Sequence, residues 1–398
     1  MPRFLVAVPA VHGHIYPAIA IAERAKAEGH DAAMLLDPHV DPRLSQLGIP
    51  LFGVQSEAKE VKFLGAERSQ ASRDHKAELE FHRDRIRGMA DKVESIREVL
   101  RTFRPDAVAV ENMTYPIAIA CRLERVPHVA YASSVSAVRP PELTYQFVQN
   151  AAALQPDIAE LFARFGLTAE LKDFVYLSPH WNAVLTTRSF VGTAGAIPPR
   201  MALVGPSIRS ISLSSLALEA ELAALPRPLV YIAFGTRFLW QPALLVACAR
   251  GVVAAGASVI ISAGQLANDE AFVKQLPAGV IAREEPPQLT ILRERADALI
   301  THGGGSSLME AMYFGVPLIV IPLAVDQPLT GYLVERSGAG VHVERSAADE
   351  QTVERAVSRA LRDPAIAQNV QRVSASYRDS NGALGIVRIM EGLQARGT

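Results

Sequence analysis

Short apolar runs alternate with longer amphipathic stretches along most of the chain. Residues 4–8 form an uninterrupted apolar run, which is typical of a parallel strand buried on both faces. A Gly-containing turn follows, and then a helical pattern from residue 17 to about residue 28, with Gly29 placed to end the helix. Similar runs predict further strands at residues 32–36, 107–110, 128–132, 229–234, 258–262, 298–301 and 318–321. Strand, loop and helix in repetition predict an α/β protein with doubly wound parallel sheets.

This rhythm is interrupted in two places, and the interruptions divide the chain. Residues 50–98 are rich in charge and mostly lack strand patterns, so they indicate a solvated helical excursion, which we favour over a specific anion site. A Ser-, Leu- and Ala-rich stretch at residues 207–224 is typical of an inter-domain linker. Further helices are expected at residues 117–123, 146–165, 242–255 and 382–393. We therefore expect an N-terminal domain at 1–205, a linker at 206–226, a C-terminal domain at 227–378, and a last helix at 379–398 that could dock on either domain.

Composition narrows the class of protein. The 398 residues are enough for two domains, and 40 Lys and Arg against 41 Asp and Glu leave a formal charge of −1. This balance gives no electrostatic case for a nucleic-acid partner. Cys121 and Cys248 both lie in apolar helical patterns, which predicts buried free thiols in a cytoplasmic enzyme rather than a disulfide framework. The most apolar stretch, residues 314–325, is too short to span a bilayer and contains two prolines, so no membrane span is expected.

The most informative segment is residues 300–310, where an apolar strand runs into three glycines and two serines. Glycines let a backbone approach a ligand closely, and the N–H groups at a helix start attract anionic oxygens. Ser306 or Ser307 could cap the helix and donate to phosphate, and His302 could add a donor. The spacing fits neither the dinucleotide fingerprint nor a Walker loop. Residues alone leave two readings open: a phosphate or diphosphate cradle, or an ordinary glycine-rich turn with a capping serine.

Several motifs together resemble the nucleotide-sugar signature of the GT-B natural-product glycosyltransferases, an inverting family with bacterial antibiotic and plant secondary-product members. The motifs occur in the expected order over almost the whole chain and begin with a Gly-His-Ile-Tyr-Pro segment at residues 13–17. The others are Pro287-Gln288, His302-Gly303-Gly304 with Ser307 and Glu310, Gly315-Val316-Pro317 and Asp326-Gln327. The resemblance implies a GT-B fold, in which two Rossmann-like domains face each other across a cleft.

The resemblance also implies a donor site in the C-terminal half. Pro287 and Gln288 would meet the nucleobase, Glu310 would accept hydrogen bonds from ribose hydroxyls, and Asp326 and Gln327 would bind the sugar. The diphosphate would be held by His302, Gly303, Gly304, Ser306, Ser307 and Thr236. Two positions depart from the family pattern. Ser306 stands where many relatives carry Asn, and Glu285 stands where plant relatives place a base-stacking Trp. Arg237 and Phe238 have no assigned role.

A histidine follows the first strand, in the loop Val11-His12-Gly13-His14 that we expect to precede a helix starting at Pro17. A His-x-His pair needs further ligands to hold a metal, and the sequence offers no matching cluster, so no metal site is expected. By resemblance, His14 is the general base that deprotonates the acceptor, and His12 is a neighbouring contact. Glu111, where Asp is usual, would be the carboxylate that orients His14, or it could point into the acceptor pocket.

The expected acceptor contacts are Asn112, Met113 and Tyr115. The sequence thus predicts an inverting, metal-independent transferase without a cofactor, acting on a UDP- or dTDP-sugar and a small natural-product acceptor, as a monomer or homodimer. Two alternatives stay open: a nucleotide-sugar epimerase or cell-wall GT-B transferase, and a catalytically silent nucleotide-sugar-binding activator subunit. Donor incubated alone would reveal an epimerase by isomer formation, and His14 argues against the silent subunit.

Overall fold

The structure, a computed structural model, describes residues 1–9, 11–36, 42–54, 75–192, 197–210, 222, 224–235 and 241–397. The chain divides into two compact units. Unit 1 comprises Met1–Thr186, Ala194–Arg209 and Asn381–Thr398, and unit 2 comprises Thr187–Thr193 and Ser210–Ser380. A short piece of the N-terminal half thus belongs to unit 2, and the C-terminal segment belongs to unit 1. Residues 211–221 and 223 of the expected linker lie outside the described residues.

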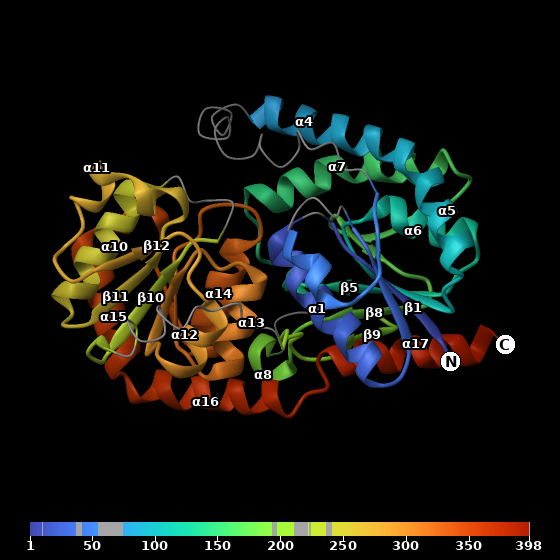
Figure 1. The fold of residues 1–398 in the computed structure, drawn as a ribbon. Coiled ribbons are helices and arrows are strands. Elements are labelled where there is room, and N and C mark those ends of the chain that lie inside the picture. Colours follow the sequence, from blue (N-terminus) through green and yellow to red (C-terminus); the bar gives the residue numbers. More distant parts are fainter. Residues whose placement is uncertain are drawn as a thin grey trace. The chain divides into compact units, whose positions relative to one another are not determined.

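Unit 1 is built on a seven-stranded parallel sheet (Figure 1). Its strands are β1 (Arg3–Ala7), β2 (Asp31–Leu35), β3 (Leu51–Phe52), β4 (Ala107–Glu111), β5 (His128–Ala132), β8 (Trp181–Val184) and β9 (Met201–Leu203). They lie in the order β3-β2-β1-β4-β5-β8-β9. The chain therefore winds outward from β1 in one direction and then from β4 in the other. β1 and β4 pair directly, with Leu5 beside Val108. The strands predicted here from apolar runs are confirmed to within one residue at each end.

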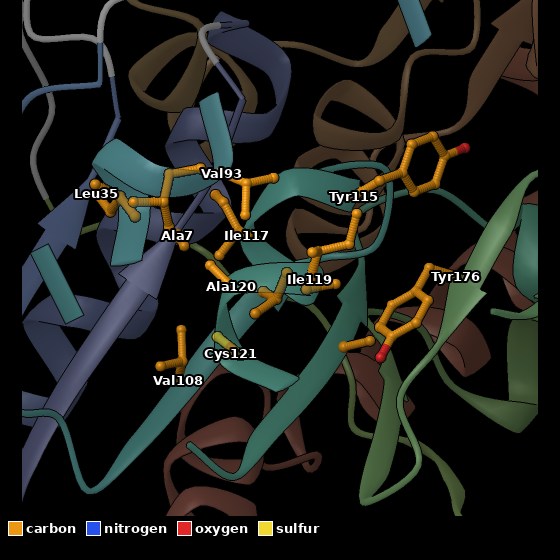
Figure 2. Packing of buried hydrophobic residues seen from close by; sticks show 14 of the residues in the cluster. Ala7, Leu35, Val93, Val108, Tyr115, Ile117, Ile119, Ala120, Cys121 and Tyr176 are labelled. Carbon is orange, nitrogen blue, oxygen red and sulfur yellow. The ribbon is translucent and has the colours of Figure 1, made fainter. Parts of the chain in front are cut away.

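Helices cover this sheet and bury its apolar side chains. They are α1 (His12–Ala27), α4 (His75–Gly88), α5 (Val93–Phe103), α6 (Tyr115–Leu123), α7 (Gln146–Ala163) and α17 (Ala383–Gly397). Figure 2 shows part of the core, in which Ala7 of β1 and Val108 of the neighbouring β4 lie with Ile117 of the covering helix α6. A small antiparallel pair, β6 (Glu170–Lys172) and β7 (Val175–Leu177), lies outside the main sheet. The last helix, α17, packs on α1, β4 and β5 of the same unit (Figure 1).

The first helix begins five residues earlier than expected, and this changes the setting of His14. We expected Pro17 to start the helix, but α1 runs from His12, with Pro17 inside it. The extra turn is held by backbone bonds from His14 and Ile15 to the Val11 carbonyl, at 2.8 and 3.0 Å. Proline removes one i→i−4 hydrogen bond and its ring crowds the preceding turn, so it is commonest near a helix start, yet one helical turn can still precede it. His14 therefore lies on the first helical turn rather than in a loop.

Unit 2 repeats the same winding on a six-stranded parallel sheet. Its strands are β10 (Leu229–Ala233), β11 (Ser258–Ser262), β12 (Ile281–Arg283), β13 (Ala298–Thr301), β14 (Leu318–Val320) and β15 (Gly340–His342), in the order β12-β11-β10-β13-β14-β15. Its helices are α8 (Arg188–Val191), α10 (Pro242–Ala254), α11 (Glu270–Val273), α12 (Gln288–Glu294), α13 (Gly305–Phe314), α14 (Gln327–Ser337), α15 (Glu350–Arg362) and α16 (Pro364–Arg378). Short 3-10 turns complete both units at Pro42–Leu47, Met89–Lys92, Ser136–Val138, Gly264–Asn268 and Arg345–Ala347. In the sheet of unit 2 the direction of winding reverses between the neighbouring strands β10 and β13.

The charged excursion, predicted without strands, begins with the two-residue strand β3, and from residue 75 onward it is helical. Helix α5 buries Val93, Ile96, Leu100 and Phe103, which recur at three- and four-residue spacing along one face. Its opposite face carries charge, including Arg97 and Arg101 paired with Glu94 and Glu124. Residues 55–74 lie outside the described part of the chain. None of the described helices is both long and apolar enough to cross a bilayer.

The two thiols give a test of the two cores. Cys121 in α6 and Cys248 in α10 are free and fully buried. Burial raises the pKa of the Cys121 thiol well above its ordinary value and that of Cys248 to about 12. We expect neither to react with a thiol reagent at pH 8 in the native protein, and both to react in guanidinium chloride. Rapid colorimetric labelling of the native protein would contradict this placement.

Candidate active site

The point at which each sheet reverses its strand order positions the candidate residues. In open α/β sheets, ligands bind beyond the carboxyl ends of the strands at such a switch point, because the loops there diverge. In unit 1 the diverging strands are β1 and β4, followed by His14 and ended by Glu111. In unit 2 they are β10 and β13, followed by Gly235 and by His302. Each unit therefore presents its own half-site at the position that its topology favours.

In unit 1 the structure brings His14 and Glu111 together. Nδ1 of His14 lies 3.0 Å from Oε1 of Glu111. The carboxylate is only 1% exposed, whereas the imidazole retains 21% exposure. A buried carboxylate beside one ring nitrogen favours the tautomer with the proton on that nitrogen, in which Nε2 can accept a proton. The extra methylene of glutamate therefore does not prevent the expected contact.

Three further groups contact Glu111, the last residue of β4. The backbone N–H of Met113 donates to Oε2 of Glu111 at 3.0 Å. The Thr114 hydroxyl donates to the Glu111 backbone carbonyl. Ser133, which follows β5, places Oγ 3.0 Å from Nδ1 of His14 and 3.4 Å from Oε1 of Glu111. Sequence reasoning missed Ser133, although its place directly after a predicted strand at the same sheet edge was a usable signal.

The expected acceptor contacts are placed differently from one another. Asn112 continues the sheet, since its N–H donates to Tyr131 and its carbonyl accepts from Tyr176, at 2.9 and 3.1 Å. Tyr115 is 5% exposed, lies in the core shown in Figure 2, and donates its hydroxyl to the Phe174 carbonyl. Its observed contact is thus structural, and its contact with an acceptor stays a prediction. Met113 is half-buried beside Glu111, and the side chain of His12 lies outside the described part.

In unit 2 the glycines make room for an imidazole. A Cβ on Gly235 would lie 2.8 Å from Cε1 of His302, and one on Gly304 would lie 2.7 Å from Nε2. The ring of His302 is therefore enclosed by two positions that tolerate no side chain. Burial lowers the pKa of His302 to about 4, against a smaller opposing effect of a hydrogen bond with the Ala233 backbone. His302 is thus a neutral polar group at pH 7.

The glycine-rich segment ends at the start of α13. Gly303 has a φ of 92° and a Cβ there would meet Val320 at 2.9 Å, so this turn requires glycine. We expected Ser306 or Ser307 to cap the helix, but the N-cap is Gly304 and has no side-chain cap. Both serines lie inside the first turn, because the helix begins at Gly305, two residues earlier than a cap at Ser306 would allow. The Leu308 N–H donates to the Gly304 carbonyl at 3.0 Å, while the N–H groups before it face the helix start, where anions bind.

Three of the expected donor residues form one hydrogen-bonded group. Nε2 of Gln288, the first residue of α12, donates to Oε2 of Glu310 at 2.6 Å and to Oγ of Ser307 at 3.3 Å. Glu310 is only 4% exposed. Pro287 is the N-cap residue of α12. The sequence placed these residues far apart along the chain, and the structure brings them to one edge of the sheet.

Asp326 and Gln327 lie after β14, at the start of α14. Oε1 of Gln327 accepts from the N–H groups of Leu323 and Ala324, at 2.7 and 2.8 Å. A contact of this side chain with a sugar would therefore use its NH2 group. Val325 has a φ of 59°, an unfavourable conformation for a β-branched residue, directly before Asp326. The expected contacts at Thr236, with Arg237 and Phe238 beside it, lie outside the described residues, and Glu285 is exposed. Among the residues that the structure describes, no three His, Cys, Asp or Glu side chains gather as metal ligands would.

Comparison with known proteins agrees with this architecture. Residues 249–391 match the family described as erythromycin biosynthesis protein CIII-like, C-terminal domain. The chain is 23% identical to NDP-glycosyltransferase YjiC of Bacillus subtilis (strain 168) over 385 residues, or 95% of this chain and 94% of that protein. The solved structure of CalG4, the calicheamicin glycosyltransferase, superposes with a TM-score of 0.75 at 20% identity, covering 100% of this chain and 99% of that one. Glycosyltransferase VinC, solved in complex with dTDP, gives a TM-score of 0.72 at 18% identity, covering 98% and 100%. The predicted resemblance and the predicted GT-B fold are confirmed.

Gly304 allows the packing around His302 to be tested. Its φ of −65° suits any residue, so Gly304→Ala adds only a methyl group against the imidazole. We expect a loss of about 1–3 kcal/mol in the free energy of unfolding and weaker binding of UDP or dTDP. Chemical denaturation and calorimetry measure the two effects. Gly392→Ala is the matched control, because a Cβ there meets nothing within 4 Å. Unchanged stability and nucleotide affinity in Gly304→Ala would refute the close packing of Gly304 against the His302 ring.

The buried, neutral state of His302 predicts acid sensitivity. Its folded pKa of about 4 lies below the unfolded value of about 6.5, so the unfolded chain binds more protons in this interval. Stability is therefore complete above about pH 6.5 and is lost as the pH falls toward 4, by on the order of 3 kcal/mol from this residue. Denaturation curves of wild type and His302→Asn between pH 7 and 4 measure the difference. Burial also lowers the pKa of His128, to about 3, but His128 is present in both proteins, so its contribution cancels in the difference between the two curves. Equal pH slopes would contradict this assignment.

Proposed function

We propose that this chain, a glycosyltransferase with the GT-B fold, transfers a sugar from a UDP- or dTDP-sugar to a hydroxyl of a small natural-product acceptor, with inversion and without a metal. The observation that carries the proposal is the 3.0 Å contact between Nδ1 of His14 and the buried carboxylate of Glu111. This pair stands at the switch point of unit 1, where a substrate group is expected to bind. Its chemistry suits proton removal from a hydroxyl near neutral pH.

The acceptor step uses Nε2 of His14, the ring nitrogen that Glu111 does not contact. Nε2 of His14 takes the hydroxyl proton while the hydroxyl oxygen attacks the anomeric carbon of the donor. The bond from that carbon to the diphosphate oxygen breaks, and the nucleoside diphosphate leaves with the electron pair. A single displacement of this kind inverts the anomeric configuration. Glu111 stabilises the imidazolium that forms, because its ionised carboxylate lies against the protonated Nδ1.

The donor half of the proposal rests on unit 2. The N–H groups of the first turn of α13, with the hydroxyls of Ser306 and Ser307, offer donors to a diphosphate. Such a cradle stabilises the charge that develops on the leaving group, which is the task that a metal performs in other enzymes. The buried Glu310 and its partner Gln288 offer an acceptor and a donor for ribose or base atoms. Asp326 offers a carboxylate to sugar hydroxyls, and VinC, a similar structure, was solved with dTDP.

Activity is first sought by incubating UDP- and dTDP-sugars with a panel of phenolic and macrolide-type acceptors and recording the gain of a sugar mass. Proton NMR of the product then gives its anomeric configuration. We expect the configuration opposite to that of the donor. A product with retained configuration would refute the single displacement. A sugar isomer formed from the donor alone would instead identify an epimerase.

Replacing the base separates chemistry from donor binding. We expect His14→Ala to lower kcat/KM by about 10²–10⁴-fold, since positioned general bases contribute this much. Calorimetric affinity for the nucleotide should stay within about twofold, because the donor residues belong to unit 2. His180→Ala, which removes an exposed histidine of unit 1 outside the site, is the matched control. Turnover of His14→Ala at the wild-type rate would refute the assignment of the base.

A further inference from the structure

We propose that Ser133 is a positioning residue for His14, acting as a second hydrogen-bond acceptor for its Nδ1–H group. The inference rests on the function proposed above, because it concerns the base of that reaction. It assigns a role to a side chain that no sequence motif marked. The observations that carry it are the two short distances from the Ser133 hydroxyl and its burial.

The sheet places Ser133 beside the pair. β4 and β5 are neighbours, with Glu111 opposite Tyr131, and Ser133 comes directly after β5. Ser133 as a whole residue is 6% exposed. Oγ lies 3.0 Å from Nδ1 of His14 and 3.4 Å from Oε1 of Glu111, while these last two atoms lie 3.0 Å apart. The three polar atoms thus form a closed triangle within the buried end of the sheet.

Counting protons gives each atom of the triangle its role. An ionised carboxylate only accepts, so the proton between His14 and Glu111 must belong to Nδ1. That N–H points at two oxygens, one from Glu111 and one from Ser133, which makes a three-centre bond. The Ser133 hydroxyl proton is then available to Oε1 of Glu111 at 3.4 Å. The other carboxylate oxygen already accepts from the Met113 N–H. The ring is therefore fixed in its Nδ1–H form, with Nε2 unprotonated.

The same geometry excludes a hydrolase-like reading of the three residues. In a serine–histidine–acid triad, the serine and the acid contact opposite nitrogens of the ring, so that the free nitrogen activates the serine. Here Ser133 and Glu111 contact the same nitrogen, Nδ1. The nitrogen that would take a proton from a nucleophile does not face Ser133. The hydroxyl therefore positions the ring and does not attack a substrate.

The direct test is the tautomer of His14, which needs no substrate. Nitrogen-15 NMR of the histidine-labelled protein, assigned with His14→Ala, reports which ring nitrogen carries the proton. We expect wild type at pH 7.5 to show protonated Nδ1 and unprotonated Nε2. Ser133→Ala should shift these resonances toward the averaged values of a mobile ring, and Ser133→Thr, which keeps the oxygen, should restore them. Wild type in the Nε2–H form, or identical spectra for wild type and Ser133→Ala, would overturn the proposal.

Kinetics provide the second arm. We expect Ser133→Ala to lower kcat about 3–10-fold with the donor KM unchanged, and Ser133→Thr to recover most of the loss. Ser134→Ala is the matched control, because the adjacent hydroxyl bonds to Ser136 at 3.0 Å and not to His14. Thermal unfolding of each variant shows whether it is folded. If Ser133→Ala keeps the wild-type kcat while His14→Ala is inactive, the role of Ser133 is refuted and the proposed function stands. If His14→Ala stays active, the proposed function fails, and the NMR arm still decides the role of Ser133.

Discussion

The two parallel sheets of this protein each reverse their strand order beside their own first strand, and the candidate chemistry depends on that reversal. In unit 1 the chain winds from β1 to β3 in one direction and from β4 to β9 in the other, so the segments that follow β1 and β4 diverge. Unit 2 does the same on either side of β10 and β13. A polar side chain placed after one of these strands meets a space that no crossover helix fills. His14, Glu111, Gly235 and His302 all occupy such places. The fold therefore determines where ligands can bind, and local sequence determines which ones.

The half-site of unit 1 requires the Glu111 carboxylate to be buried away from water. Removing a charge from solvent costs several kcal/mol unless hydrogen bonds replace its hydration. Glu111 has such bonds from the Met113 N–H on one oxygen and from His14 and Ser133 on the other. Glu111 contacts His14 with Oε1, while its other oxygen, Oε2, accepts from the backbone N–H of Met113, two residues later in the chain. This arrangement explains how the longer side chain is accommodated without disturbing the strand, whose pairing continues through Asn112 to Tyr131 and Tyr176.

Sequence patterns predicted the parts of the molecule in which a single residue property decides the structure. The buried parallel strands were predictable because both faces must be apolar, and β5, β11 and β13 match their expected ranges. The short outer strands β12 and β15 were not predictable, since three mixed residues carry no period and pair only because a neighbouring strand is present. The predicted start of α1 was wrong because Pro17 is an ambiguous signal. The predicted serine cap of α13 was wrong because Gly304 is the N-cap residue. Ser133 was missed because its partners are 22 and 119 residues away in sequence.

The two half-sites treat charge in opposite ways, and the chemistry of the proposed reaction gives a reason. In unit 1 the buried charge of Glu111 lies against a ring that must become cationic during the reaction, so an ion pair forms when the proton moves. In unit 2 the ligand is expected to bring its own negative charge, and the protein offers neutral donors: a helix start, serine hydroxyls and a histidine whose burial keeps it uncharged. Neutral dipoles stabilise the charge that develops and still let the product leave. A formal charge of −1 is therefore compatible with the polyanionic donor of the proposed reaction.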